Sequence, residues 1–221
     1  GEWSIYLYLP NGDQNSNGPL MLGSTTVKVK EFEPDKLKVT LKLTPDRKQG
    51  WVKPSELKAN IDVQNLFGTP AQNRRVASKL TLRPIYPSFT QYPDYQFYEN
   101  RNNSEGFETD LEDQTTDDNG LAEIKLDIGA YADATHQLQL ISDAFETGSG
   151  RSVTAVASMI VSPYDYLVGV KADDDLSYIK HHAERHLNVI AVDPSLVPIE
   201  LPELTLSLIE QTYLSVLTKQ P

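Results

Sequence analysis

The most regular feature of the chain is an alternation of apolar and polar residues with a period of two. Residues 36–44 read Lys-Leu-Lys-Val-Thr-Leu-Lys-Leu-Thr, so every second residue is apolar. Because successive side chains of a β-strand point to opposite faces, this pattern predicts a strand with one buried and one wet face. The same pattern predicts further strands at residues 27–29, 57–63, 80–82, 122–128, 138–140, 153–159, 187–191 and 204–208.

Turn-forming residues separate these apolar segments. Asn-Gly or Gly-rich steps occur at residues 11–12, 17–18, 119–120 and 148–150, and residues 67–70 read Phe-Gly-Thr-Pro. Helical periodicity is nearly absent, although residues 174–186 form a short helical candidate with acids early and histidines late. Short alternating strands between such turns favour antiparallel sheets over a parallel α/β sheet. The sequence therefore predicts an all-β protein built from antiparallel β-sandwiches.

Residues 84–118 interrupt this pattern and are too long for an ordinary hairpin loop. Residues 84–107 concentrate aromatic residues and proline, and residues 105–118 contain seven acidic side chains. We predict an elaborated excursion between two strands, with a flexible acidic surface in its second part. The aromatic residues allow two interpretations. They form a small satellite core beneath a long loop, or the tyrosines form an exposed sugar-stacking platform: Tyr86, Tyr92, Tyr95 and Tyr98.

Charge and composition exclude several classes of function. The 221 residues include 31 acidic and 20 basic side chains, which gives a net charge of -11, and there is no cysteine. Without cysteine, the chain has no disulfide, cysteine-based metal centre or thiol nucleophile. The acidic balance disfavours binding to nucleic acid or to an anionic membrane. No apolar run approaches the roughly 20 residues that span a bilayer, so we expect no direct membrane insertion.

The chain offers few groups for catalysis or metal binding. His182 and His186 are four residues apart, so on a helix both would face one metal ion, with His181 nearby. No His-Glu-x-x-His motif accompanies them, and the acids of residues 105–118 lack the spacing of a calcium-binding loop. Ser149 lies in Gly-Ser-Gly, which is a turn sequence. We therefore expect no catalytic residue, no metal and no cofactor, and hence no enzyme.

Four short motifs follow one another along the chain: Glu-Phe-Glu-Pro at residues 31–34, Phe-Gly-Thr-Pro at 67–70, Asp-Asn-Gly at 118–120 and Gly-Arg-Ser-Val at 150–153. In this order and spacing, they resemble the macroglobulin-like domains of bacterial alpha-2-macroglobulins. In that family a Phe-x-Pro step joins one domain to the next, which carries a Phe-Gly-x-Pro hairpin. The resemblance covers essentially the whole chain. It implies a series of antiparallel immunoglobulin-like or fibronectin-III-like β-sandwiches.

The resemblance also implies how the chain is divided. Residues 1–33 would be the C-terminal strands of one macroglobulin-like domain, residues 34–163 one complete domain, and residues 164–221 the N-terminal part of a further domain. Phe32 and Pro34 would form the first interdomain junction, with Phe32 packed between domains and Pro34 fixing the direction of the chain. Both ends would then be cut from a longer polypeptide.

The function implied by the resemblance is that of a structural scaffold in a protease-trapping inhibitor. Its partners would be neighbouring macroglobulin-like domains and the target proteases. The expected location is the periplasm, with membrane anchoring or secretion through the N-terminus of the parent protein left open. An alternative, from the tyrosines alone, is an extracellular adhesin or carbohydrate-binding module.

Two devices of the family are not evident in this sequence. Thioester-bearing members carry Cys-x-Glu-Gln, whereas the only Glu-Gln here is Glu210-Gln211, with Leu208 at the cysteine position. The sequence does not decide whether the parent protein carries a thioester elsewhere. Residues 99–118 have the composition of a flexible bait segment, but in the family the bait lies outside the ordinary macroglobulin-like domains. We therefore favour a surface ornament for this excursion.

Overall fold

The computed structural model of the chain describes residues 2–9, 20–28, 36–99, 105–129, 133–148, 150–173, 176, 180, 182–205 and 207. The chain divides into two compact units, Gly1–Lys36 and Leu37–Pro221. Within the described ranges, the only helical segment is the short 3-10 turn η1 (Pro54–Glu56). None of the described residues belongs to a helix long and apolar enough to cross a membrane.

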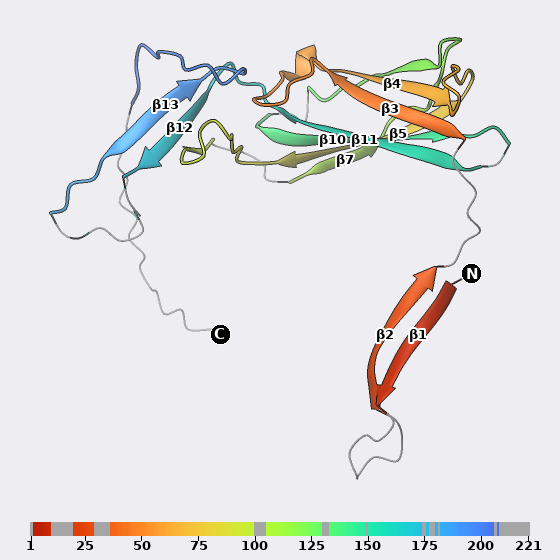
Figure 1. Ribbon diagram of the computed structural model, residues 1–221. Coiled ribbons are helices and arrows are strands. Elements are labelled where there is room, and N and C mark those ends of the chain that lie inside the picture. The colour runs from red at the N-terminus through yellow and green to blue at the C-terminus, as the bar shows by residue number, and fades with distance from the viewer. Residues whose placement is uncertain are drawn as a thin grey trace, which may run out of the picture. The chain divides into compact units, whose positions relative to one another are not determined.

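The first unit contains one antiparallel hairpin, formed by β1 (Glu2–Leu9) and β2 (Leu20–Lys28) (Figure 1). Trp3 pairs with Val27, and the register shifts by one residue after Leu7. All side chains described in β1 are exposed, including Trp3 at 65%. The hairpin therefore has no buried face of its own among the described residues.

The second unit begins with a β-sandwich of two antiparallel sheets, which Figure 1 shows stacked on each other. The first sheet has the order β3-β4-β9, with β3 at Leu37–Thr44, β4 at Lys58–Asn65 and β9 at Leu121–Ile124. The second sheet has the order β11-β10-β5-β7, with β11 at Ser152–Val161, β10 at His136–Phe145, β5 at Arg75–Pro84 and β7 at Phe107–Asp110. The short strand β8 (Gln114–Thr115) also pairs with β5.

The sandwich core contains the apolar residues that the alternation predicts to point inward. Leu41 and Ile61 come from the first sheet, and Leu80 and Leu138 from the second. Because both sheets bury every second side chain, their inner faces close on one another and exclude water. The all-β prediction and the antiparallel β-sandwich architecture are confirmed.

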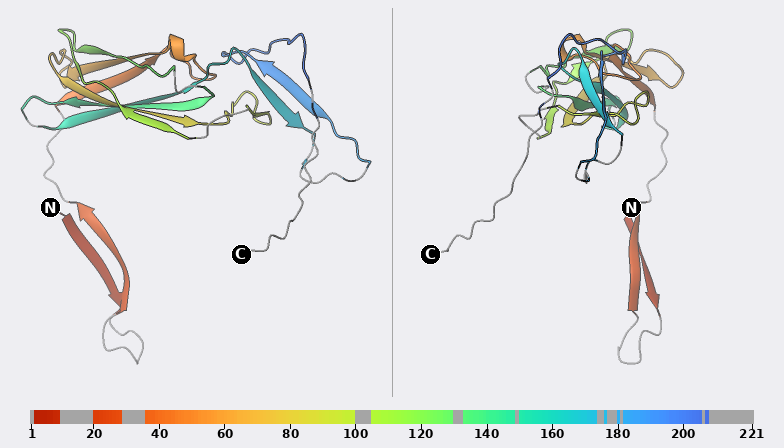
Figure 2. Two further views of the ribbon diagram at one scale, coloured as in Figure 1. Left: turned by 180° about the vertical axis from the view of Figure 1, so that it is seen from behind. Right: turned by 90° about the vertical axis from the view of Figure 1, so that its left-hand side faces the viewer.

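A smaller third sheet is formed mainly by residues that follow the sandwich in sequence. Its hairpin consists of β12 (Leu167–Ala172) and β13 (Leu187–Val192), which pair antiparallel (Figure 2). Its third strand is β6 (Gln96–Phe97), which comes from the aromatic excursion and pairs antiparallel with β12. The excursion predicted between two strands is therefore real, and part of it belongs to a sheet formed by later residues.

Four local expectations are wrong. The strand expected at residues 122–128 ends at Ile124, although Ile128 is still buried. Residues 204, 205 and 207 are not in a strand, and residues 182–186 are not helical. Part of the acidic stretch is ordered as β7, because Phe107–Asp110 pairs with Leu82–Lys79 of β5, where Lys79 forms an ion pair with Glu108.

The alternation along β13, which predicts Leu187, Val189 and Ala191 as the buried side chains, is only partly confirmed. Ala191 is buried, at 7% exposure, but Leu187 and Val189 are exposed at 42% and 43%, and Val192 on the other face is fully buried with Ile190 packed beside it. Both faces of this strand are apolar in sequence, so alternation alone does not decide which of them is covered. The aromatic excursion packs against the Ile190 and Val192 face.

Candidate functional site

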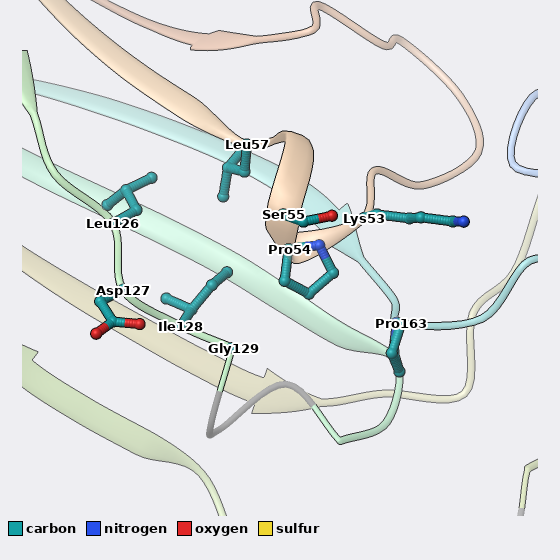
Figure 3. A pocket seen from close by; sticks show the side chains of 9 residues that line it. All are labelled: Lys53, Pro54, Ser55, Leu57, Leu126, Asp127, Ile128, Gly129 and Pro163. Atoms are coloured by element: carbon teal, nitrogen blue, oxygen red, sulfur yellow. The ribbon is translucent and has the colours of Figure 1, made fainter.

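A cleft of about 450 Å³ opens beside the η1 turn (Figure 3). Leu57, Leu126 and Ile128 form its apolar wall. In Figure 3, Asp127 points away from Leu57, and Lys53 extends away from Ile128. Because the polar groups do not converge on one point, this cleft lacks the arrangement of acid, base or nucleophile that catalysis requires.

The histidines do not form the metal site that a helix would allow. Residues 182–186 form a turn and coil, so His182 and His186 do not share a helical face. The backbone N–H of His186 donates to the Asp173 carboxylate at 3.0 Å, and the ring Nδ1 lies 3.3 Å from the same oxygen. These contacts hold the pKa of Asp173 below its ordinary value, with the backbone hydrogen bond as the main cause. No group of three potential metal ligands occurs among the described residues.

Several residues singled out from the sequence cannot be placed. Phe32, Pro34, Ser149 and His181 lie outside the described residues, as does the Glu210-Gln211 pair. The junction assigned to Phe32 and Pro34 therefore stays a prediction.

The most distinctive feature of the second unit is a second hydrophobic cluster, separate from the sandwich core. Its buried members come from three stretches of sequence: the loop after β3, the aromatic excursion, and the β12–β13 region with the turn that follows it. They are Trp51, Phe89, Phe97, Leu167, Val192 and Leu196. We call this group the aromatic cluster. Because it joins segments up to 145 positions apart, from Trp51 to Leu196, it ties the sandwich to the hairpin.

Within the aromatic cluster, Trp51 contacts several separate segments of the chain. Its side chain is fully buried, and its ring centroid lies 6.1 Å from that of Phe89. Its indole Nε1–H donates to the carbonyl oxygen of Tyr164 at 2.9 Å, and its backbone N–H donates to that of Pro194 at 3.2 Å. One residue thus binds the chain on both sides of the β12–β13 hairpin.

Two glycines allow backbones and rings to approach closely around the aromatic cluster. Gly50 has a φ of +81°, and a Cβ added there would lie 2.0 Å from the carbonyl oxygen of Pro194. A Cβ added at Gly169 would lie 2.7 Å from the ring of Phe97. Glycine is therefore required at Gly50 both for conformation and for space, and at Gly169 the absent Cβ leaves room for the ring. The sequence analysis missed both positions, although a Gly-Trp step after a polar loop is a detectable signal.

The tyrosines of the excursion divide into two groups. Tyr92 and Tyr95 are partly buried against the aromatic cluster, and the Tyr92 hydroxyl donates to the carbonyl oxygen of Leu196 at 3.0 Å. Tyr86 and Tyr98 are exposed at 54% and 62%, with their rings edge to face at 5.1 Å. The four residues therefore do not form one platform. The satellite-core interpretation is the one that the structure bears out.

Two ion pairs lie at the edge of the same region. Lys53 pairs with Asp165, and Lys171 pairs with Asp94 at 2.7 Å. In each pair the hydrogen bond to the carboxylate, followed by its charge, raises the pKa of the lysine above its ordinary value. Both pairs are solvent-exposed, so they orient the segments more than they stabilise them.

Comparison with known proteins gives this fold a family. Residues 35–163 match the family described as the bacterial alpha-2-macroglobulin MG5 domain, which is more than half of the chain. The chain belongs to the bacterial alpha-2-macroglobulin family. Trp51, Phe89 and Phe97 lie inside the matched MG5 region, whereas Leu167, Val192 and Leu196 lie beyond it. The aromatic cluster therefore crosses the C-terminal limit of that region.

Curated relatives in this family cover the whole chain. An alpha-2-macroglobulin homolog of Yersinia pestis is 69% identical over 220 residues, which are 100% of this chain and 11% of the relative. An alpha-2-macroglobulin of Pasteurella multocida is 41% identical over 223 residues, which are 100% of this chain and 12% of that protein. The chain thus spans about a ninth of the length of the curated relatives that it matches.

Solved structures of bacterial alpha-2-macroglobulins share the fold. A Salmonella alpha-2-macroglobulin mutant gives a TM-score of 0.56 at 19% identity, covering 87% of this chain and 13% of that one. A trypsin-activated alpha-2-macroglobulin of Escherichia coli gives 0.55 at 19% identity, covering 90% of this chain and 14% of that one. At this level of identity the likeness shows that the β-sandwich fold is the same.

Proposed function

We propose that this chain is part of the structural frame of a bacterial protein that traps proteases. Family membership supports the proposal, as do the Escherichia coli alpha-2-macroglobulins that are described as activated by trypsin and by porcine elastase. The observation that carries it is the aromatic cluster, which extends from the MG5 region into the residues beyond it. A frame of serial domains needs such contacts, because trapping depends on controlled motion between domains.

The chain has no catalytic role of its own in this proposal. The polar side chains around the cleft of Figure 3 point in different directions and do not converge on one point. The partners are neighbouring macroglobulin-like domains of a longer parent protein, and the target proteases meet that parent as a whole. We place the parent in the periplasm, where proteases from outside the cell would be met.

The domain limits remain those expected from the motifs. Residues 1–33 close one macroglobulin-like domain, residues 34–163 form a complete domain and residues 164–221 begin another. The matched MG5 region at residues 35–163 supports the two limits of the middle domain.

Phe32 and Pro34 form the first interdomain junction in this proposal. Replacing Phe32 by Ala should loosen the angle between the first two units and increase the radius of gyration in small-angle X-ray scattering. A scattering curve identical to that of the unmodified chain would contradict the role of Phe32. The replacement Phe67→Ala is a matched control, because the side chain of Phe67 is 98% exposed.

An activity assay on the 221-residue chain tests the non-catalytic role. The chain alone should neither cleave a peptide substrate nor change the rate at which trypsin cleaves one. Cleavage by the chain, or inhibition of trypsin by the chain alone, would refute the assignment to the frame.

A further inference from the structure

The aromatic part of the excursion, residues 85–99, is hydrogen-bonded at both of its ends to one residue of the sandwich, Thr135. The backbone N–H of Ile85 donates to the carbonyl oxygen of Thr135 at 3.0 Å. Fourteen positions later, the Glu99 carboxylate accepts hydrogen bonds from the backbone N–H of Thr135 at 2.7 Å and from its hydroxyl at 2.9 Å. Thr135 is fully buried, and its hydroxyl oxygen also lies 3.0 Å from that of Ser162, within hydrogen-bond distance. Both ends of the excursion are therefore fixed to the sandwich.

The excursion is packed internally by its own aromatic residues. Backbone hydrogen bonds run from Tyr92 N–H to the Phe89 carbonyl at 2.9 Å and from Tyr95 N–H to the Tyr92 carbonyl at 3.2 Å. The rings of Phe89 and Phe97 meet edge to face at 5.1 Å. Edge-to-face aromatic pairs add stability beyond the area that they bury. Residues 85–99 thus form a packed element and not a loose loop.

The far side of this element contributes a strand to the next sheet. Phe97 pairs with Gly169 and Gln96 with Val170, so β6 extends the β12–β13 hairpin to three strands. The Asp94 carboxylate also forms an ion pair with Lys171 of β12, with 2.7 Å between Oδ2 and Nζ. A strand added to a sheet edge contributes backbone hydrogen bonds, and the Phe97 ring fills the space above Gly169.

We propose that residues 85–99 are a clamp that joins the sandwich formed by β3–β5 and β7–β11 to the β12–β13 hairpin, so that the two move as one rigid body. The hairpin alone is a two-stranded ribbon, which is marginally stable in water. The clamp supplies its third strand and, in Phe89 and Phe97, two of the three buried aromatic side chains of the aromatic cluster. A motion that opens the parent protein would then occur on either side of this pair and not between its two members.

The absence of cysteine makes this proposal testable by spin labelling of the intact chain. Nitroxide labels at Gln139→Cys on β10 and Asn188→Cys on β13, both exposed positions, report the distance from sandwich to hairpin. Labels at Gln139→Cys and Lys38→Cys on β3 report the sandwich alone. Pulsed electron paramagnetic resonance should give a narrow distance distribution for both label pairs in the otherwise unmodified chain.

Phe97→Ala removes the ring that the clamp places against Gly169. It should broaden the sandwich-to-hairpin distribution about twofold and leave the sandwich distribution unchanged. Phe67→Ala removes the same side chain from a site that is 98% exposed and should change neither distribution. A sandwich-to-hairpin distribution that is already broad in the unmodified chain, or that stays narrow in Phe97→Ala, would overturn the proposal.

Gly50→Ala provides a second test that leaves every aromatic ring in place. The added Cβ would collide with the carbonyl oxygen of Pro194, so the hairpin should separate from the sandwich and its distance distribution should broaden. Gly68→Ala is the matched control, because Gly68 has a φ of +83° and no atom within 4 Å of an added Cβ. If Phe97→Ala also broadens the distance distribution within the sandwich, the test rests on comparing Gly50→Ala with Gly68→Ala. Sandwich-to-hairpin distance distributions of equal width in these two variants would overturn the proposal.

Discussion

Trp51 donates its indole N–H to the carbonyl oxygen of Tyr164 at 2.9 Å. Trp51 precedes β4 of the sandwich, whereas Tyr164 is the first residue beyond the matched MG5 region. A fully buried indole N–H without a partner costs free energy, so this bond decides which way the tryptophan ring is turned. The segment that begins at Tyr164 therefore helps to bury Trp51, a side chain of the MG5 region.

Trp51→Phe tests the value of this pairing. The variant keeps an aromatic ring but removes the indole N–H that donates to the Tyr164 carbonyl, and its smaller ring leaves part of the buried space unfilled. We expect the free energy of unfolding to fall by about 1–3 kcal/mol, measured by urea denaturation with circular dichroism. Trp3→Phe is the control, because Trp3 is 65% exposed, and it should leave the free energy unchanged. Equal effects of the two replacements would contradict a structural role for Trp51.

Ser78 and Ser142 form a buried hydroxyl pair across β5 and β10. Their Oγ atoms lie 2.8 Å apart, and both side chains are buried. Ser142→Ala should cost about 1–3 kcal/mol of unfolding free energy, because the Ser78 hydroxyl would lose its partner. The double replacement Ser78→Ala/Ser142→Ala should recover part of this loss, since no unpaired hydroxyl remains. Strictly additive losses in the double-mutant cycle would show that the two hydroxyls do not interact.

Asp117 makes stability depend on pH at the turn before β9. Its carboxylate accepts hydrogen bonds from the backbone N–H groups of Leu121 and Asn119, each at 2.8 Å. These bonds, first that of Leu121, hold the pKa of Asp117 below its ordinary value. The stabilising contribution is therefore complete above the unfolded-state pKa, which is about 3.9, and is lost as the pH falls through the lower folded-state pKa.

Asp117→Asn isolates this charge effect, because the amide oxygen still accepts hydrogen bonds. The unmodified chain should unfold with a higher free energy than the variant at neutral pH, and the difference should shrink as the pH is lowered to about 3. Urea denaturation of both proteins at a series of pH values measures this difference in unfolding free energy. A difference that is constant with pH, or that grows in acid, would contradict the assignment.

The sandwich is predictable from sequence because its strands have one buried and one wet face. Residues 36–44 alternate strictly, so the pattern identifies both the strand and the side that faces the core. The strand β13 defeats the same reasoning, since Leu187 and Val189 on one face are as apolar as Ile190 and Val192 on the other. Which face is buried there depends on the excursion that packs against it, and periodicity within β13 does not contain that information.

The aromatic cluster is predictable only in part. The density of aromatic residues between 84 and 107 indicates a satellite core, and Phe89 and Phe97 are indeed buried in it. Trp51 and Leu196 join them from distant parts of the sequence, through a turn in which Gly50 has a positive φ. Such long-range partners are set by tertiary packing and not by local pattern. The family resemblance, in contrast, rests on short motifs, and the MG5 match confirms it.

The central claim is that this chain belongs to the frame of a protease trap, and the most direct measurement is made on the full-length protein. After reaction with trypsin, the protein should let trypsin cleave a small peptide substrate but should shield it from a large protein substrate. The same assay with the 221-residue chain alone should show no shielding. Full access of trypsin to both substrates in the presence of the full-length protein would contradict the account.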